Sequence, residues 1–230
     1  NQIVIGTCVY PCDLVGRMFQ EGLQKFNLCF EKLCSLLPFP GSDLTLLNPC
    51  SRINSSCIID DFSPVGPFYF CGDRNEINRT KHDSFVRLLF ESCSGSVLAS
   101  SAAQIESLVD ELHVICLALF HISCGSPGRA TDYSSLSFYG PARNLFFLQG
   151  HAFSVLRNSK IEKMTQRSAS LIVRSFPKEV SDIFAKLLLV IRPIHVCVKL
   201  YLLANDSLLQ EQFIENSVSH AFLNHGGEPF

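Results

Sequence analysis

The chain has 230 residues, is 47% hydrophobic and carries a formal net charge of −2, so it is long and apolar enough to bury a core in one or two domains. No stretch approaches the roughly 18 consecutive apolar residues of a membrane span. The first 17 residues, NQIVIGTCVYPCDLVGR, lack the basic region and the long apolar run of a signal peptide. These features argue against a membrane protein and predict an intracellular one.

The cysteines favour the same compartment. There are eleven, an odd number, with no CxxC pair, and most lie in apolar runs such as FNLCFEKLCSLL. Reduced core thiols explain this pattern better than a disulfide scaffold or a zinc site, the two alternatives.

The first hundred residues predict a helical region with an irregular middle. Apolar residues recur every three or four positions over 13–37, which predicts an amphipathic helix. Residues 38–75 are rich in Pro, Ser, Asn and Asp and predict mostly irregular structure. A second helix is expected over 76–92, and 101–123 gives the clearest helical pattern, with a C-terminal half that should be buried.

The remainder, 101–230, predicts a second unit that contains a small sheet. A short helix should follow residue 128, and a hairpin should turn at Gln149-Gly150. A third strand and a helix between Pro177 and Pro193 come next, followed by a helix over 206–215 and a last strand in VSHAFLN. The predicted fold is α+β and mostly helical, with a helical N-terminal half followed by a three-stranded antiparallel sheet flanked by helices.

Several common chemistries have no motif in the chain. No GxxxxGK[ST] loop, HExxH or compact Cys/His cluster is present, so no cofactor or metal is expected. Ser126 lies in GSPG, which is not GxSxG, so a hydrolase is disfavoured. His113 and His121 lie on an apolar helix and are expected in core or capping roles.

Positive charge is concentrated in one segment. Between Arg129 and Arg192 the chain has ten basic and four acidic residues, a net charge of +6, so the rest carries −8. Such asymmetry indicates a surface that faces a polyanion, although an ordinary solvated face remains an alternative.

The order of motifs in this segment resembles the first half of the catalytic domain of tyrosine (phage-integrase-type) recombinases. GSPGRATDYSSL matches the family's turn, arginine and following helix. ARNLFFLQG, VLRNSK, RSFPKEV and LLLVIRP follow in the order seen in a fungal group that occurs in RecQ-type helicase proteins and mobile-element products. Downstream, HAFLNHGGEPF is similar to that group's next motif.

The resemblance implies a role for each basic residue. Arg129 would bind the scissile phosphate, which suits a permanently charged, bidentate guanidinium. Lys160 would protonate the leaving 5′-oxygen as a general acid. The residues expected to contact the DNA backbone are Arg157, Lys163, Arg167 and Arg174. Two alternatives stay open: Arg129 caps the preceding helix, and Lys160 is an ordinary surface lysine.

The resemblance also implies limits. In RATDYSSL, Asp132 keeps the family's acidic position, but Tyr133 stands where a core leucine is usual. The family's H-x-x-R motif and nucleophilic tyrosine should follow the last motif, so 101–230 is expected to be a truncated half domain without strand-cleavage activity. The predicted function is DNA binding, with duplex DNA and a helicase region as partners and a nuclear location. The alternative is a helical interaction or scaffold domain with no nucleic-acid role.

Overall fold

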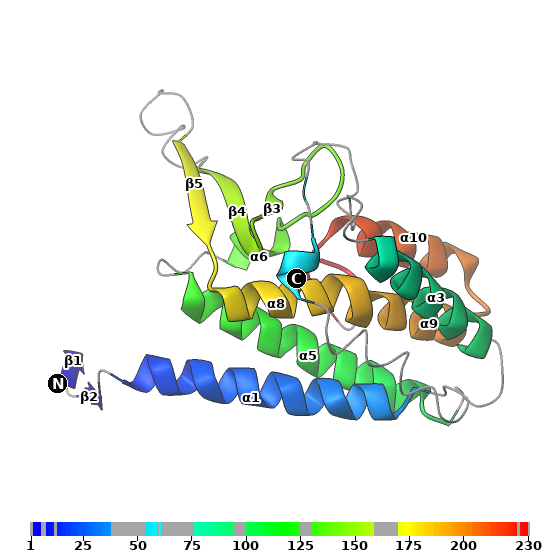
Figure 1. Ribbon diagram of the computed structural model, residues 1–230, viewed down its shortest axis with the longest axis horizontal. Coiled ribbons are helices and arrows are strands. Elements are labelled where there is room, and N and C mark those ends of the chain that lie inside the picture. The colour runs from blue at the N-terminus through cyan, green and yellow to red at the C-terminus, as the bar shows by residue number, and fades with distance from the viewer. Residues whose placement is uncertain are drawn as a thin grey trace.

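A computed structural model describes residues 2–5, 8–11, 13–37, 54–58, 60, 76–93, 100–124, 130–158, 170–224 and 226–229. Helices make up most of it, and a small three-stranded sheet rises from one end of the helical layer (Figure 1). The fold is therefore α+β and mostly helical, as predicted. A short hairpin of β1 (Gln2–Ile5) and β2 (Cys8–Pro11) precedes the first helix and was not predicted.

Two long helices, α1 (Leu14–Ser35) and α5 (Ala102–Ser123), lie side by side along one edge of the molecule (Figure 1). The buried residues of α1 are spaced by three and four positions, as an amphipathic helix requires; they are Phe26, Cys29, Phe30 and Leu33. At Gly22 a Cβ atom would lie 2.8 Å from Leu119 Cδ2. The missing side chain therefore lets the two helices approach closely.

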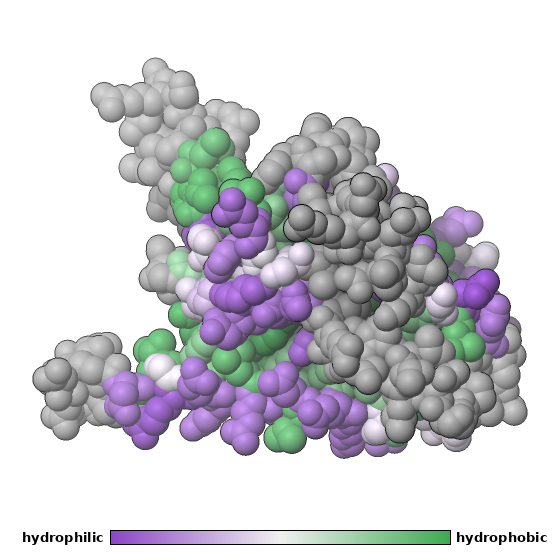
Figure 2. Space-filling model, viewed as in Figure 1, coloured by the Kyte–Doolittle hydropathy of each residue, from purple (hydrophilic) through white to green (hydrophobic). Residues whose placement is uncertain are grey.

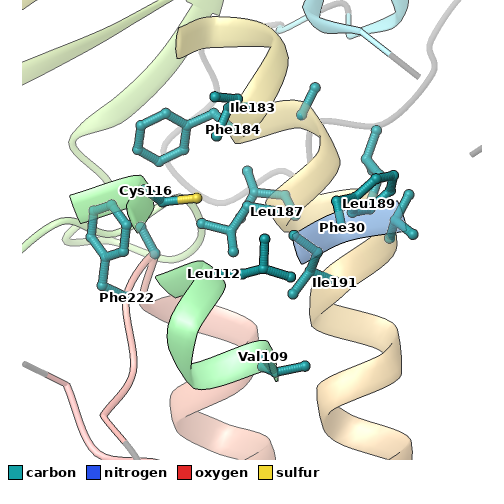
Figure 3. Close-up of a cluster of buried hydrophobic side chains, with 14 of the residues drawn as sticks. Phe30, Val109, Leu112, Cys116, Ile183, Phe184, Leu187, Leu189, Ile191 and Phe222 are labelled. Atoms are coloured by element: carbon teal, nitrogen blue, oxygen red, sulfur yellow. The ribbon is translucent and has the colours of Figure 1, made fainter. Parts of the chain in front are cut away.

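One buried cluster joins the N-terminal and C-terminal parts of the chain. At its aromatic centre Phe120 of α5 stacks on Phe176 with a centroid distance of 3.9 Å and meets Phe184 and Phe222 edge to face. Figure 3 shows Phe30 of α1 in the same cluster as side chains from α5 and from the helix after the sheet. The cluster thus includes side chains from both of the predicted regions, 1–100 and 101–230.

The sheet has the strand order β3 (Leu145–Leu148), β4 (His151–Asn158), β5 (Ser170–Ser175), all antiparallel. The predicted turn is confirmed: Gln149 and Gly150 both have positive φ, +50° and +78°, as a two-residue type I′ hairpin requires. Side chains alternate along the strands, so Ala152, Ser154 and Leu156 face the core.

The helix that starts after Pro177 is longer than predicted. α8 (Lys178–Lys186) passes through a π-helical turn, η3 (Leu187–Ile191), into α9 (Arg192–Leu202), so the predicted end at Pro193 is wrong. Proline has no N–H for the carbonyl four residues earlier. That carbonyl, Leu189 O, instead accepts a hydrogen bond from His82 Nε2 (2.7 Å), and the wide turn accommodates the proline ring.

Three further helices complete the described structure: α3 (Glu76–Cys93), α6 (Ala130–Ser134) and α10 (Ser207–Ser219). The strand predicted in VSHAFLN is wrong, because α10 extends to Ser219 and the described residues after it form isolated bridges, Ser137 to His220 and Leu223 to Pro229. Within the residues described here, no helix is long and apolar enough to cross a membrane.

The cysteines are only partly as predicted. Cys29, Cys34 and Cys116 are free thiols, and burial raises the pKa of Cys29 and of Cys34 to about 11 and that of Cys116 further. Cys197, by contrast, is disulfide-bonded. Its sulfur lies 3.8 Å from Leu89 O, where α9 faces α3.

Candidate nucleic-acid interface

The short helix α6 follows Arg129 directly, and two contacts anchor it. Tyr133 packs edge to face on Phe120 (5.6 Å between centroids), and its hydroxyl lies 2.7 Å from His121 Nδ1 at the end of α5. On the other side, Asp132 forms an ion pair with Arg174 Nη2 of β5 at 3.4 Å. Helix α5 and the sheet thus both hold the helix that begins after Arg129; Arg129 itself lies outside the described residues.

Arg174 does not have the exposed position expected of a DNA-backbone contact. It is 7% exposed, and its guanidinium faces Asp132 from the inner side of the sheet. This placement makes Arg174 a link between β5 and α6, with little surface to offer a phosphate group.

The other predicted backbone contacts belong, in sequence, to the end of β4 and to the connection between β4 and β5. These strands pair as far as Asn158 and Ser170, and Arg157 is opposite Leu171 in the register. The connection 159–169 carries Lys160, Lys163 and Arg167 and lies outside the described residues, as does the side chain of Arg157. The convergence of Arg129 and Lys160 on one DNA-binding face therefore stays a prediction.

Much of the positive charge in 129–192 is used inside the protein. Arg143 forms a fully buried ion pair with Asp60, which also accepts a hydrogen bond from Phe147 N (2.9 Å). Lys186 lies over the rings of Phe26 and Phe30, 5.9 and 5.3 Å from the centroids. The charge asymmetry therefore overstates the surface available to a polyanion.

A Ser–Lys–Asp cluster joins the 3-10 turn η1 (Ser55–Cys57) to α8, and no spacing in the sequence indicated it. Lys178 Nζ donates to Ser55 Oγ (2.7 Å) and to Asp182 Oδ1 (2.8 Å), and Ser55 N donates to the same carboxylate oxygen (2.8 Å). Burial alone would raise the pKa of Asp182, but the hydrogen bonds from Lys178 and Ser55 lower it. These hydrogen bonds fasten η1 to α8.

A second buried polar group lies between α5 and α9. Lys199 forms an ion pair with Glu106, and the rings of His113 and His195 meet edge to face at 5.5 Å. His113 Nδ1 bonds Leu223 O (2.9 Å); burial, with the charge of Arg192, lowers the pKa of His113 to about 3. His113 is thus neutral and structural, as the sequence predicted.

The outer face of the sheet is apolar and open. Leu171 and Val173 of β5 are 66% and 63% exposed, and Phe146 stacks on Phe153 beside them at 5.6 Å. Figure 2 shows hydrophobic surface over this part of the sheet. Contiguous exposed apolar surface of this kind marks interaction sites in many proteins.

Comparisons of the chain with protein-family models, with curated proteins and with solved structures find no match. Within the ranges given above, no group of three or more His, Cys, Asp or Glu side chains is placed to hold a metal ion. The function of this protein is therefore inferred from its own residues and their geometry.

Proposed function

We propose that the protein is a DNA-binding module of the tyrosine-recombinase type, and that Arg129 and the 157–167 segment contact phosphate groups. The observation that carries the proposal is the support of α6. Helix α5, the segment that contains Arg129, the short helix α6 and the three-stranded antiparallel sheet follow one another in the chain, and the Asp132–Arg174 pair fixes α6 to the sheet. Such support holds the segment next to an arginine in place, as phosphate binding requires.

The distribution of the remaining positive charge supports the same assignment. Five basic residues of 129–192 have described side chains and are engaged within the fold, among them Arg143, Arg174 and Lys178. The other five are Arg129, in the chain segment just before α6, and four residues at the end of β4 or in the connection from β4 to β5; these four are Arg157, Lys160, Lys163 and Arg167. The proposed interface is limited to these two segments. The proposed activity is DNA binding. We propose with it that the protein is nuclear and that a helicase region is a partner.

Fluorescence anisotropy with a short labelled duplex at 50 and 200 mM salt tests the proposal. The wild type should bind with strong salt dependence. Arg129→Ala with Lys160→Ala should weaken binding and reduce the slope of log K against log salt by about 2, roughly one for each lost phosphate contact.

Arg17→Ala with Lys25→Ala is the matched control, since both side chains are exposed on α1, away from the sheet. This pair removes the same charge and should leave the slope unchanged. Equal losses in the two double variants would mean non-specific attraction, and absence of binding by folded protein at 50 mM salt would contradict the proposal.

The open apolar face of the sheet favours a second candidate, a protein-interaction module. β5 is an edge strand of the sheet and presents Leu171 and Val173 to solvent, and such an edge can pair with another strand. Sedimentation velocity would detect self-association through this face. If Leu171→Lys with Val173→Lys abolished self-association and DNA binding were absent, the interaction role would replace the first proposal.

A further inference from the structure

A pocket of about 480 Å³ lies between α3 and α10. Its walls are apolar residues one helical turn apart, Val86 and Phe90 on α3 and Ile214 and Val218 on α10. The π-helical turn and the start of α9 form the floor, with Leu188, Leu189, Arg192, Pro193 and Val196. The volume falls in the range of about 300–1,000 Å³ that is typical of small-molecule sites.

Arg192 brings a buried charge to this apolar lining. It is 5% exposed, and its Nη2 donates to the carbonyl oxygens of His220 (3.0 Å) and Ala221 (2.7 Å). Its Nε and Nη1 atoms have no hydrogen-bond partner among the described residues. Burial lowers the pKa of Arg192 to about 9, but the guanidinium still carries its charge at neutral pH.

A buried cation without a counter-charge is costly, and a carboxylate is the partner that removes the cost most fully. It supplies the opposite charge and accepts two parallel hydrogen bonds from a guanidinium. Ser217, which also lines the pocket, has a buried hydroxyl with no described partner and can donate to the same group. Among the described residues of the lining, Arg192 and Ser217 carry the buried polar atoms without a partner, and both can donate to an anion.

We propose that this pocket binds a small monocarboxylate with an apolar tail. The carboxylate group pairs with Arg192 and Ser217, and the tail lies between α3 and α10. A polyanion such as DNA does not suit the apolar walls, so this site is independent of the proposed DNA interface. Its position beside the π-helical turn agrees with the frequent occurrence of such turns at functional sites.

Isothermal titration calorimetry with octanoate, octanol and octylamine tests the carboxylate requirement. Octanoate should bind at least tenfold more tightly than the alcohol or the amine, and Arg192→Met should remove this preference. Equal binding of the three compounds, or no binding of octanoate at millimolar concentration, would overturn the proposal.

Because Arg192→Met also removes bonds to two backbone carbonyls, a pair of variants on the exposed wall gives a second test. Val218 is 47% exposed at the pocket rim. Val218→Asp should weaken octanoate binding at least threefold through charge repulsion, and Val218→Lys should not. Leu208→Asp, on the same helix, 73% exposed and outside the lining, is the matched control and should leave binding unchanged. An equal effect of the two Val218 variants would contradict a carboxylate at Arg192.

Discussion

The ion pair between Asp60 and Arg143 gives a sharp test of how the segment around Asp60 is held to the sheet. Both side chains are completely buried, and Arg143 Nε also donates to Leu145 O (3.3 Å) at the start of β3. Asp60→Asn keeps an oxygen that can accept from Phe147 N but removes the charge opposite Arg143. Arg143→Met removes the other charge and keeps most of the side-chain volume.

The expected magnitude follows from burial. Removing one partner of a buried ion pair leaves an uncompensated charge and costs about 3–5 kcal/mol. For a chain of this size each kcal/mol corresponds to about 2–4 °C in Tm, so each single variant should melt roughly 6–20 °C lower. The double variant buries neither charge, so its free energy of unfolding should be no lower than that of the less stable single variant. The stability losses of the two single variants have the same cause, an unpaired buried charge.

Urea unfolding of the four proteins at neutral pH, followed by circular dichroism, measures the cycle. Arg17→Ala is a suitable control, since its ion pair with Asp13 is exposed and should contribute less than about 1 kcal/mol. Single-variant losses that add within about 0.5 kcal/mol in the double variant would refute the assignment of a coupled, desolvated pair.

Three further outcomes are expected. The folded pKa of His113 is about 3, below its ordinary value of 6.5, so the unfolded chain binds the proton first. The free energy of unfolding should therefore fall by about 1.4 kcal/mol per pH unit as pH drops from 6.5 toward 3. Urea titrations at pH 7 and 5 measure this fall, and the same pH dependence in His113→Gln would contradict it. Gln149→Asn should raise stability by about 0.5 kcal/mol, because asparagine tolerates the positive φ at this turn better; an unchanged urea midpoint would argue against strain there. Cys29 and Cys116 are buried with raised pKa, so both thiols should resist maleimide at pH 7 until the protein unfolds, as mass spectrometry would report.

Local pattern was enough to predict much of the fold. The helix of residues 102–123, the Gln149-Gly150 turn and the third strand depend on periodicity and turn chemistry within a few residues. Pro193 misled the prediction, because the group that satisfies the freed carbonyl is His82, on a helix more than a hundred residues earlier. The sequence around the proline does not indicate that His82 is this partner.

For the candidate sites too, local features were visible in the sequence and distant contacts were not. A run of basic residues is visible in sequence, but the acids that engage Arg143 and Arg174 are distant or lie on another element, so the charge count could not tell paired from available residues. The pocket between α3 and α10 was missed for a similar reason. Arg192 was visible in the motif LLLVIRP, but its burial and the approach of Ser217 depend on how α10 packs.

The π-helical turn determines how the continuous helix α8–η3–α9 responds to the insertion or deletion of a residue. A turn of this kind accommodates one residue more than an α-helical turn, so the faces of α8 and α9 are offset by about 100° relative to a regular α-helix. α8 packs against β4, η1 and α5, and α9 packs against α3, α5 and α10. Deleting one residue from 187–191 would restore regular winding but turn Lys199 away from Glu106 and His195 away from His113. A substitution elsewhere in the helix would disturb one half, whereas the length of this turn sets the rotational angle between the two halves.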